Sequence, residues 1–164
     1  MIKERRSIRR YKANPVPKEA IIKVLEAGRM APSAGHRQPW HFIVVQDKES
    51  IEKLSGGRKW AAGAPVMIVG LANLEASPTW CYNDFSIAFE HIVLAATDQG
   101  LGTCWMGKMR QDAEIKELLG IPNKFKVIAL TPLGWPDETP GPKDRKGLVE
   151  IVSWERFGKK RGSA

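Results

Sequence analysis

The hydrophobic and polar positions along the chain predict short amphipathic helices and short apolar strands. In the segment 17–29, Ile21, Ile22 and Leu25 share one helical face, and Pro17 stands where a first helical turn accepts proline. Continuous apolar runs rich in β-branched and aromatic residues predict buried strands. The elements expected in chain order are helices over residues 2–7, 17–29, 48–54, 84–98 and 111–119, and strands over residues 40–45, 66–71, 126–131 and 149–154.

The segment 84–98 has the strongest helical pattern in the chain. Asn83 stands where a capping side chain is favoured, and Gly100 and Gly102 follow the last apolar position. Its apolar residues are Phe85, Ala88, Phe89, Ile92 and Ala96 on one side and Ile87, Leu94 and Ala95 on the other. A helix that is apolar nearly all round is buried in a core or against a second subunit.

The order of these elements favours an α+β fold. Helices come first, and strands and helices then mix without a regular βαβ alternation, which disfavours a doubly wound parallel sheet. The chain has 164 residues and shows no internal repeat, low-complexity stretch or linker. We therefore expect one domain over residues 1–164, with residues 158–164 as a flexible tail.

Charge and cysteine content narrow the classes of protein. Lys and Arg number 26 against 18 Asp and Glu, which gives a formal net charge of +8. A basic protein attracts polyanions such as nucleic acid, and a phosphate-bearing cofactor would also use these cations. Cys81 and Cys104 are too few for a disulfide scaffold. Because no apolar run resembles a signal region or spans a bilayer, we expect a cytoplasmic protein outside the membrane.

Several common catalytic motifs are missing from the sequence. It has no G-x-x-x-x-G-K-[ST] loop, no G-x-G-x-x-G after a strand, and no G-x-S-x-G to mark a nucleophile. His36, His41 and His91 lie far apart, and no Cys/His spacing typical of a metal site occurs, so we expect no bound metal. His41 and His91 lie in apolar elements, where we expect hydrogen-bonded core histidines.

Two segments rich in cations are candidates for binding an anion. The segment 5–11 carries four arginines and Ser7, and guanidinium groups donate in pairs to phosphate oxygens. Prolines stiffen the segment 140–146, in which Lys143 and Arg145 project to the same side when the chain is extended. The alternatives are a basic arm, solvated or on nucleic acid, for the first segment and a charged surface loop for the second.

A third polar segment, residues 32–40, leaves a helix and enters a strand. Its small residues at positions 33–35 allow a ligand to approach the backbone closely. His36 and Gln38 can both donate and accept hydrogen bonds. The alternative is a plain turn.

Four motifs follow one another along nearly the whole chain. They are Arg5-Arg6-Ser7-Ile8-Arg9, Pro32-Ser33 with Gln38-Pro39-Trp40-His41-Phe42, Gly100-Leu101-Gly102-Thr103-Cys104-Trp105-Met106-Gly107, and Leu133-Gly134-Trp135-Pro136 with Pro142-Lys143 and Arg145-Lys146. Each motif is modest alone, and the ordered set resembles the flavin-dependent nitroreductase family. The resemblance implies an α+β homodimer with a central antiparallel sheet flanked by helices. The four-stranded sheet of one subunit would gain a fifth strand, residues 149–154, from the C-terminus of the other, and the helix 84–98 would lie at the dimer centre.

The resemblance also implies a binding site for FMN at the subunit interface. Arg5, Ser7, Lys143 and Arg145 would hold the phosphate with Arg6 beside them, and Arg9 would lie near the flavin N1/O2 edge. Pro32, Ser33 and Ala34 would come from the partner chain. Backbone N–H groups around Met106 and Gly107 would face flavin N5, and Lys59 would approach the ring. The segment that carries Pro32 also supplies His36, which stands where many relatives have Asn, and Gln38.

The activity implied by the resemblance is that of an FMN-dependent NAD(P)H oxidoreductase. A hydride from NADH or NADPH would pass through flavin N5 to an electron-poor nitroaromatic, quinone or flavin-like acceptor in a ping-pong cycle, with no obligatory side-chain acid or base. The short segment between Asn73 and Asn83 predicts an open pocket with Trp80 or Tyr82 as a lid, or as simple packing residues. The alternatives are a flavin-binding protein without turnover and a small basic nucleic-acid-binding domain.

Overall fold

A central antiparallel sheet organises the chain, which the computed structural model describes over residues 2–160. Its strands are β1 (Trp40–Val45), β2 (Val66–Asn73), β5 (Phe125–Gly134) and the two-residue strands β3 (Gly102–Thr103) and β4 (Met106–Gly107). The order is β1-β2-β5-β3, and β4 also pairs with β5. All four pairings are antiparallel, which confirms the expected sheet type. The sheet has five strands within one chain, where the resemblance implied four.

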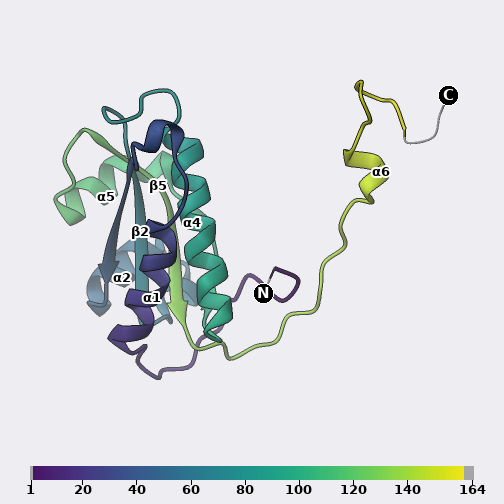
Figure 1. Cartoon of the computed structure of the whole chain (residues 1–164). Coiled ribbons are helices and arrows are strands. Elements are labelled where there is room, and N and C mark those ends of the chain that lie inside the picture. The colour runs from purple at the N-terminus through teal and green to yellow at the C-terminus, as the bar shows by residue number, and fades with distance from the viewer. Residues whose placement is uncertain (1, 161–164) are drawn as a thin grey trace.

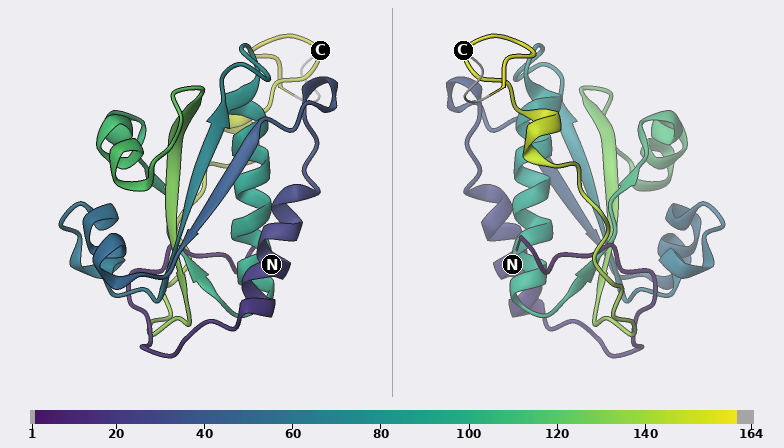
Figure 2. Two further views of the ribbon diagram at one scale, coloured as in Figure 1. Left: turned by 90° about the vertical axis from the view of Figure 1, so that its left-hand side faces the viewer. Right: turned by 90° about the vertical axis from the view of Figure 1, so that its right-hand side faces the viewer.

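Helices cover both faces of this sheet (Figures 1 and 2). One face carries α1 (Lys18–Arg29) and α4 (Cys81–Asp98), and the other carries α2 (Lys48–Ser55), α3 (Lys59–Ala62) and α5 (Asp112–Leu119). Within β2, Ile68 packs in the core on the α4 side while Met67 and Val69 pack in the core on the α2 side. A strand buried on both faces needs the continuous apolar run found there. The expected α+β architecture is confirmed.

The α4 helix packs closely on the sheet because a glycine lies beneath it. Phe85 and Phe89 are fully buried, with ring centroids 5.1 Å apart. A Cβ atom at Gly70 of β2 would lie 2.5 Å from the Phe85 ring. The helix therefore sits at a distance that no larger residue at position 70 allows.

Six expected elements differ from the structure only in their bounds, and the strand expected over 40–45 has the bounds of β1. The helix expected over 84–98 starts earlier, at Cys81, so Asn83 lies inside it and does not cap it. Gly120 does end α5 in a left-handed conformation, with φ of 64°. Three short elements were not predicted, because a segment of two to four residues carries no periodic pattern: the strands β3 and β4 and the single-turn helix α3.

The two ends of the chain depart from the expected secondary structure. Residues 2–7 form turns and a bridge, not a helix, because Ser7 pairs with Thr103 and the backbone runs along β3. Residues 149–154 do not form a strand: α6 (Leu148–Ile151) occupies this region. A strand requires a neighbouring strand for its hydrogen bonds, and the C-terminal arm, residues 137–160, leaves the body of the molecule (Figure 1).

The C-terminal arm exposes several large apolar side chains. Leu148 is 75% exposed, and Val149, Ile151 and Phe157 are also exposed. Of the expected flexible tail, residues 161–164 lie outside the described residues, and residues 158–160 form a turn that returns to Trp154 through the Lys159 carbonyl. No described helix is both long and apolar enough to cross a bilayer.

Candidate functional site

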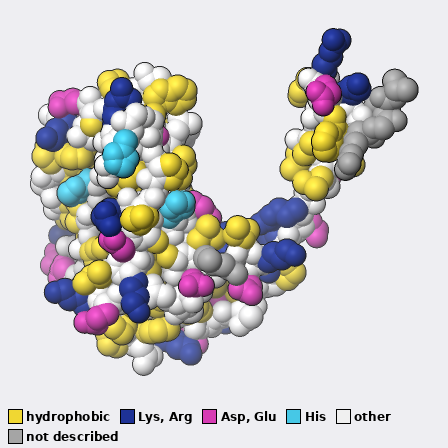
Figure 3. Space-filling view, in the orientation of Figure 1, with side chains coloured by type: hydrophobic (Ala, Val, Ile, Leu, Met, Phe, Trp, Pro, Cys, Tyr) yellow, Lys and Arg dark blue, Asp and Glu magenta, His cyan; other side chains and the backbone are white. Residues whose placement is uncertain are grey.

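A basic cavity forms where the N-terminal segment meets the C-terminal arm. It has a volume of about 540 Å³ and is lined by residues of both segments. Six of the lining residues are ones that the resemblance assigned to FMN, and we call them the basic cradle: Arg5, Arg6, Ser7, Lys143 and Arg145, expected at the phosphate, and Arg9, expected at the flavin ring. Dark-blue cationic side chains gather where the arm leaves the body (Figure 3). Residues nearly 140 positions apart in the sequence are thus brought together, as the resemblance implied.

The N-terminal half of the basic cradle is fixed by the edge of the sheet. Ser7 forms a parallel bridge with Thr103, and the Ile8 N–H donates to the Thr103 carbonyl at 2.8 Å. Gly102 has no side chain to keep Ile8 away, since a Cβ there would lie 2.8 Å from Ile8 Cγ1. The arginines on either side of Ser7 and Ile8 therefore project from an anchored backbone.

Glu138 ties the C-terminal arm to the N-terminal segment. Its Oε1 accepts hydrogen bonds from the Arg9 N–H and, at 3.2 Å, from the Arg10 N–H. The Asp137 N–H in turn donates to the Arg10 carbonyl at 3.0 Å. These bonds hold the two halves of the basic cradle side by side, although no regular secondary structure spans them.

The charges of the cavity suit an anion with several oxygens. Six cationic side chains line it against the single carboxylate of Glu138. The Arg6 Nε is buried and has no hydrogen-bond partner among the described residues. Arg5 Nε lies 3.8 Å from Glu90 on α4, and burial raises the pKa of Glu90 while Arg5 and His91 lower it. Forked donors and an orphaned guanidinium N–H fit the phosphate of FMN.

Arg9 links the basic cradle to α3. Its guanidinium lies 5.6 Å from the centroid of the Trp60 ring, a cation–π distance. Lys59, the residue before Trp60, begins α3 and is exposed. The two cations expected at the flavin ring, Arg9 and Lys59, are therefore neighbours through Trp60, although Lys59 does not line the cavity.

The backbone expected to face flavin N5 lies on β4. Met106 and Gly107 pair with Leu130 and Ala129 of β5. The Met106 side chain is buried, whereas a Cβ at Gly107 would have no neighbour within 4 Å. The strand thus leaves open space on the side of Gly107.

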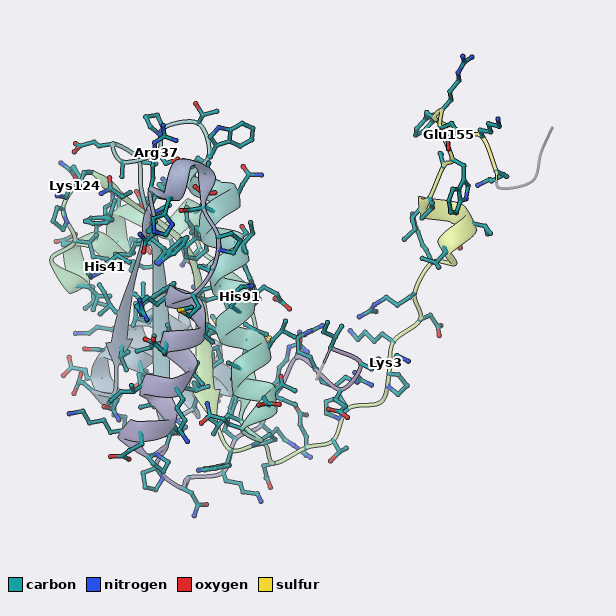
Figure 4. The ribbon with its side chains drawn as sticks, viewed as in Figure 1. Lys3, Arg37, His41, His91, Lys124 and Glu155 are labelled. Atoms are coloured by element: carbon teal, nitrogen blue, oxygen red, sulfur yellow. The ribbon has the colours of Figure 1, made fainter. Side chains whose placement is uncertain are left out.

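The loop that carries Pro32, Ser33, Ala34, His36 and Gln38 lies away from the basic cradle in the same chain. In Figure 4, Arg37 of this loop and Lys3 of the cradle's N-terminal segment lie at opposite ends of the molecule. The structure therefore does not bring these residues into one site within a single chain. Contact between the two groups requires a second copy of the chain, as the resemblance implied.

The 32–38 loop is held in a strained conformation. His36 and Gln38 have φ of 55° and 47°, values that non-glycine residues rarely adopt. The Ser33 Oγ accepts from the Gln38 N–H at 2.9 Å, and the Asp84 Oδ1 accepts from the Ala34 N–H at 3.0 Å. The His36 Nε2 and Gln38 Nε2 lie 3.2 Å apart. Strain of this kind persists only where surrounding contacts fix the backbone, and it is frequent at functional sites.

The other candidate residues have separate environments. His41 is exposed and lies against Phe125, so the expectation of a core histidine is wrong there; it lies on the same face of β1 as Ile43 and Val45, at the end of this edge strand. His91 is partly buried, with Nδ1 3.3 Å from the Ala27 carbonyl. Cys81 and Cys104 are free and buried. Among residues 2–160, no three His, Cys, Asp or Glu side chains gather as a metal site would require.

Four contributors were not singled out from the sequence: Trp60, Asp84, Glu90 and Glu138. The sequence offered a signal for Asp84, because it is a charged residue beside Phe85 in the most apolar helix. In the structure the Asp84 side chain is only 4% exposed. Glu138 and Trp60 carried none, since their roles depend on contacts with segments distant in the chain.

Comparisons with known proteins agree with this geometry. The family model described as the nitroreductase family matches residues 2–56 and 54–135. A protein of Methanothermobacter thermautotrophicus, provisionally named NADH dehydrogenase/NAD(P)H nitroreductase, is 41% identical over 151 residues, which cover 87% of this chain and 79% of that protein.

Two solved structures share the fold over almost all of the chain. The FMN-dependent nitroreductase of Clostridium difficile R20291 is 36% identical with a TM-score of 0.84, over 96% of this chain and 100% of that one. The NADPH:FMN oxidoreductase of Vibrio harveyi, solved with NAD+, is 26% identical with a TM-score of 0.87, over 97% of this chain and 77% of that one. The family resemblance drawn from the motifs is thereby confirmed, and the chain belongs to the nitroreductase family.

Proposed function

We propose that this protein is an FMN-dependent NAD(P)H oxidoreductase. The observation that carries the proposal is the convergence of Arg5, Arg6, Arg9, Lys143 and Arg145 on one cavity. Cations gathered in this way outnumber the nearby carboxylates of Glu90 and Glu138 and repel one another, and an anionic ligand would relieve that repulsion. The names of its relatives state an FMN-dependent activity and NAD(P)H as donor for those proteins.

In this proposal the basic cradle binds the phosphate of FMN. Arg5 and Arg145 would donate forked hydrogen bonds to it, Ser7 would donate from its hydroxyl, and Lys143 would add a point charge. Glu90 holds Arg5 toward the cavity through their ion pair. Glu138 acts on the backbone, since it fixes the N–H groups of Arg9 and Arg10.

The ring of FMN would lie between Arg9, Lys59 and the backbone of β4. Bound FMN would supply the redox chemistry, the transfer of a hydride equivalent from NADH or NADPH to the acceptor in a ping-pong cycle. The Arg9 guanidinium, which lies 5.6 Å from the centroid of the Trp60 ring, would stabilise negative charge at the N1/O2 edge. Backbone N–H groups at Met106 and Gly107 would hold the N5 edge. Water supplies protons, so no side-chain acid or base is assigned.

We propose a homodimer in which each site is completed by the other subunit. The 32–38 loop, remote from the cradle of its own chain, would supply Pro32, Ser33 and Ala34 to the partner's flavin, with His36 and Gln38 beside them. The exposed apolar residues of the C-terminal arm would be covered by the second subunit, which removes apolar surface from water at roughly 25 cal/mol per Å². On binding, residues 149–154 would join the partner's sheet as an exchanged strand.

The acceptor would be an electron-poor nitroaromatic, quinone or flavin-like molecule. Trp80 and Tyr82, at the start of α4, are 52% and 41% exposed, so neither closes over the body of its own subunit. An open pocket accepts acceptors of different shapes. The two buried free thiols suit a reducing cytoplasm as the place of action.

The test is a visible absorption spectrum of the purified protein, followed by addition of NADH or NADPH without oxygen. We expect a flavin spectrum that bleaches. A flavin spectrum that persists with both donors would support a binding protein without turnover. A colourless protein that takes up no added FMN would refute the proposal, and salt-dependent binding to DNA or RNA would then identify the cradle as a nucleic-acid surface.

A further inference from the structure

A second group of nitrogen donors, outside the basic cradle, surrounds the turn between α2 and α3. A Cβ atom at Gly56 would lie 3.1 Å from Lys108 Nζ, 3.3 Å from an Arg58 guanidinium nitrogen and 3.4 Å from the Gln111 amide nitrogen. Gly56 adopts a φ of 60°, which glycine tolerates. Donors from two separate segments, 56–58 and 108–111, thus converge on one point.

No carboxylate forms an ion pair with the positive charges of this group. Lys108 is 3% exposed, and its Nζ donates to the Gln111 Oε1 at 2.5 Å. Among residues 2–160, neither Lys108 nor Arg58 forms an ion pair. Burial lowers the pKa of Lys108, Arg58 lowers it further, and Glu114 raises it. A buried ammonium without an ion-pair partner is costly, and the two cations of the group exceed the one carboxylate of Glu114, so the site favours an anion.

A cavity of about 300 Å³ opens beside these donors, between α2 and α5. Lys108, Gln111 and Glu114 form its polar wall, and Leu54, Ile115 and Leu118 form its apolar wall. Lys53, at the rim, already pairs with Glu49 at 2.7 Å. The cavity gives a ligand access to Lys108, which is otherwise buried.

The position of the group relates it to the proposed flavin site. Arg58 directly precedes Lys59, and Lys108 directly follows Gly107, and both of these neighbours are expected at the flavin ring. The donors therefore lie on the two segments that would line the ring, where part of a bound nucleotide could reach them.

The geometry points to a phosphoryl-binding site formed by Lys108, Arg58 and Gln111, whose ligand is the 2′-phosphate of NADPH or inorganic phosphate. A phosphate dianion matches the two positive charges, and its oxygens accept from all three side chains. The NADPH source rests on the proposed function, whereas binding of inorganic phosphate does not.

Binding is tested by calorimetric titration of inorganic phosphate into the Arg5→Ala/Arg145→Ala protein, in which the basic cradle no longer competes. We expect binding that weakens about tenfold or more on further substitution Arg58→Ala or Lys108→Met, because a charge-assisted hydrogen bond is lost. Lys23→Ala, which removes an exposed charge on α1, is the matched control and should change nothing. Arg58 is exposed, so its variant decides the test even where Lys108→Met fails to fold.

The proposal is overturned when the parent variant binds no phosphate, or when Arg58→Ala binds it as tightly as the parent.

Whether the phosphate belongs to NADPH or is inorganic phosphate is decided by activity measurements on the FMN-loaded protein, in which Arg58→Ala is the one substitution. A tenfold fall in kcat/KM for NADPH with NADH unchanged in Arg58→Ala identifies the donor phosphate. Lost phosphate binding with both donors unchanged identifies inorganic phosphate. A protein without reductase activity refutes the proposed function alone, since calorimetry still decides the site.

Discussion

The carboxylate of Asp84 accepts a hydrogen bond from the backbone N–H of Ala34 at 3.0 Å, across 50 positions of sequence. This contact joins the first turn of α4 to the strained 32–38 loop. The second carboxylate oxygen of Asp84 is buried without a partner among the described residues. Asp84 thus helps Ser33 to hold the loop's conformation, on which the loop's proposed contribution to a flavin of the second subunit would depend.

Substitution Asp84→Ala should release the loop. We expect the free energy of unfolding to fall by about 1–3 kcal/mol, because the buried Ala34 N–H loses its acceptor, and FMN affinity to fall with it. Asp84→Asn keeps an acceptor oxygen and should restore most of the affinity. Urea denaturation and flavin fluorescence titration measure the two effects. Equal FMN affinity in Asp84→Ala and the parent would show that the loop does not reach the cofactor.

Replacing Arg5 and Arg145 together with Ala should release FMN from the basic cradle. Two charge-assisted contacts would be lost, at roughly 1.5–3 kcal/mol each. The protein should elute colourless from gel filtration, while Lys23→Ala should retain its flavin. Unchanged flavin content in the double variant would refute the assignment of these arginines to the phosphate.

Truncation after Lys146 should abolish the dimer. It removes α6 and the exposed apolar residues Leu148, Val149, Ile151 and Phe157, which we propose are covered by the second subunit. Light scattering should then give a monomer mass. A truncated protein that remains dimeric would place the main interface elsewhere, on α4 for instance.

Substitution Gly70→Ala should destabilise the fold, because its Cβ would meet the Phe85 ring at 2.5 Å. Overpacking of this kind costs about 1–3 kcal/mol. Gly141→Ala is the matched control, since a Cβ there has no neighbour within 4 Å. Thermal unfolding of the two variants should differ by several degrees, and an unchanged Tm for Gly70→Ala would mean that α4 shifts freely over the sheet.

The thiols of Cys81 and Cys104 should be unreactive in the folded protein. Burial raises the pKa of both, so at pH 8 the thiolate fraction is smaller than for a free cysteine. A disulfide reagent should label them only after denaturation. Substitution of both by Ser should leave reductase activity largely intact. Loss of activity without unfolding would reveal thiol chemistry near Ser7.

The sequence predicted those parts of the molecule whose partners are nearby or whose pattern is strong. The segment around Ile21 and the run from Val66 to Leu71 carry the periodicities of an amphipathic helix and of a doubly buried strand, and both formed as expected. Residues 149–154 carry a strand pattern, yet α6 forms in this region because no strand of the same chain lies beside it. A strand pattern is expressed only where a neighbouring strand supplies the backbone hydrogen bonds.

In the candidate site, too, residues with a recognisable motif were predicted, and contacts between distant segments were not. Arginines near both ends of the chain were assigned to one phosphate by the family resemblance, and the structure places them around one cavity. The contacts of Glu138 with the backbone at Arg9 and of Arg9 with Trp60 were missed. They arise only once the chain has folded, and no spacing in the sequence encodes them.

Glu138 also links two proposed binding events thermodynamically, the binding of FMN and the binding of a second subunit. The bonds from Glu138 to the backbone of Arg9 and Arg10 join the base of the C-terminal arm to the cofactor cavity. A second subunit that captures the arm therefore steadies the cavity, and FMN in the cavity steadies the base of the arm. By reciprocity, FMN must strengthen subunit association by the same factor by which association strengthens FMN binding. Dilution would then separate the subunits and release the flavin before any part of the protein's core unfolds.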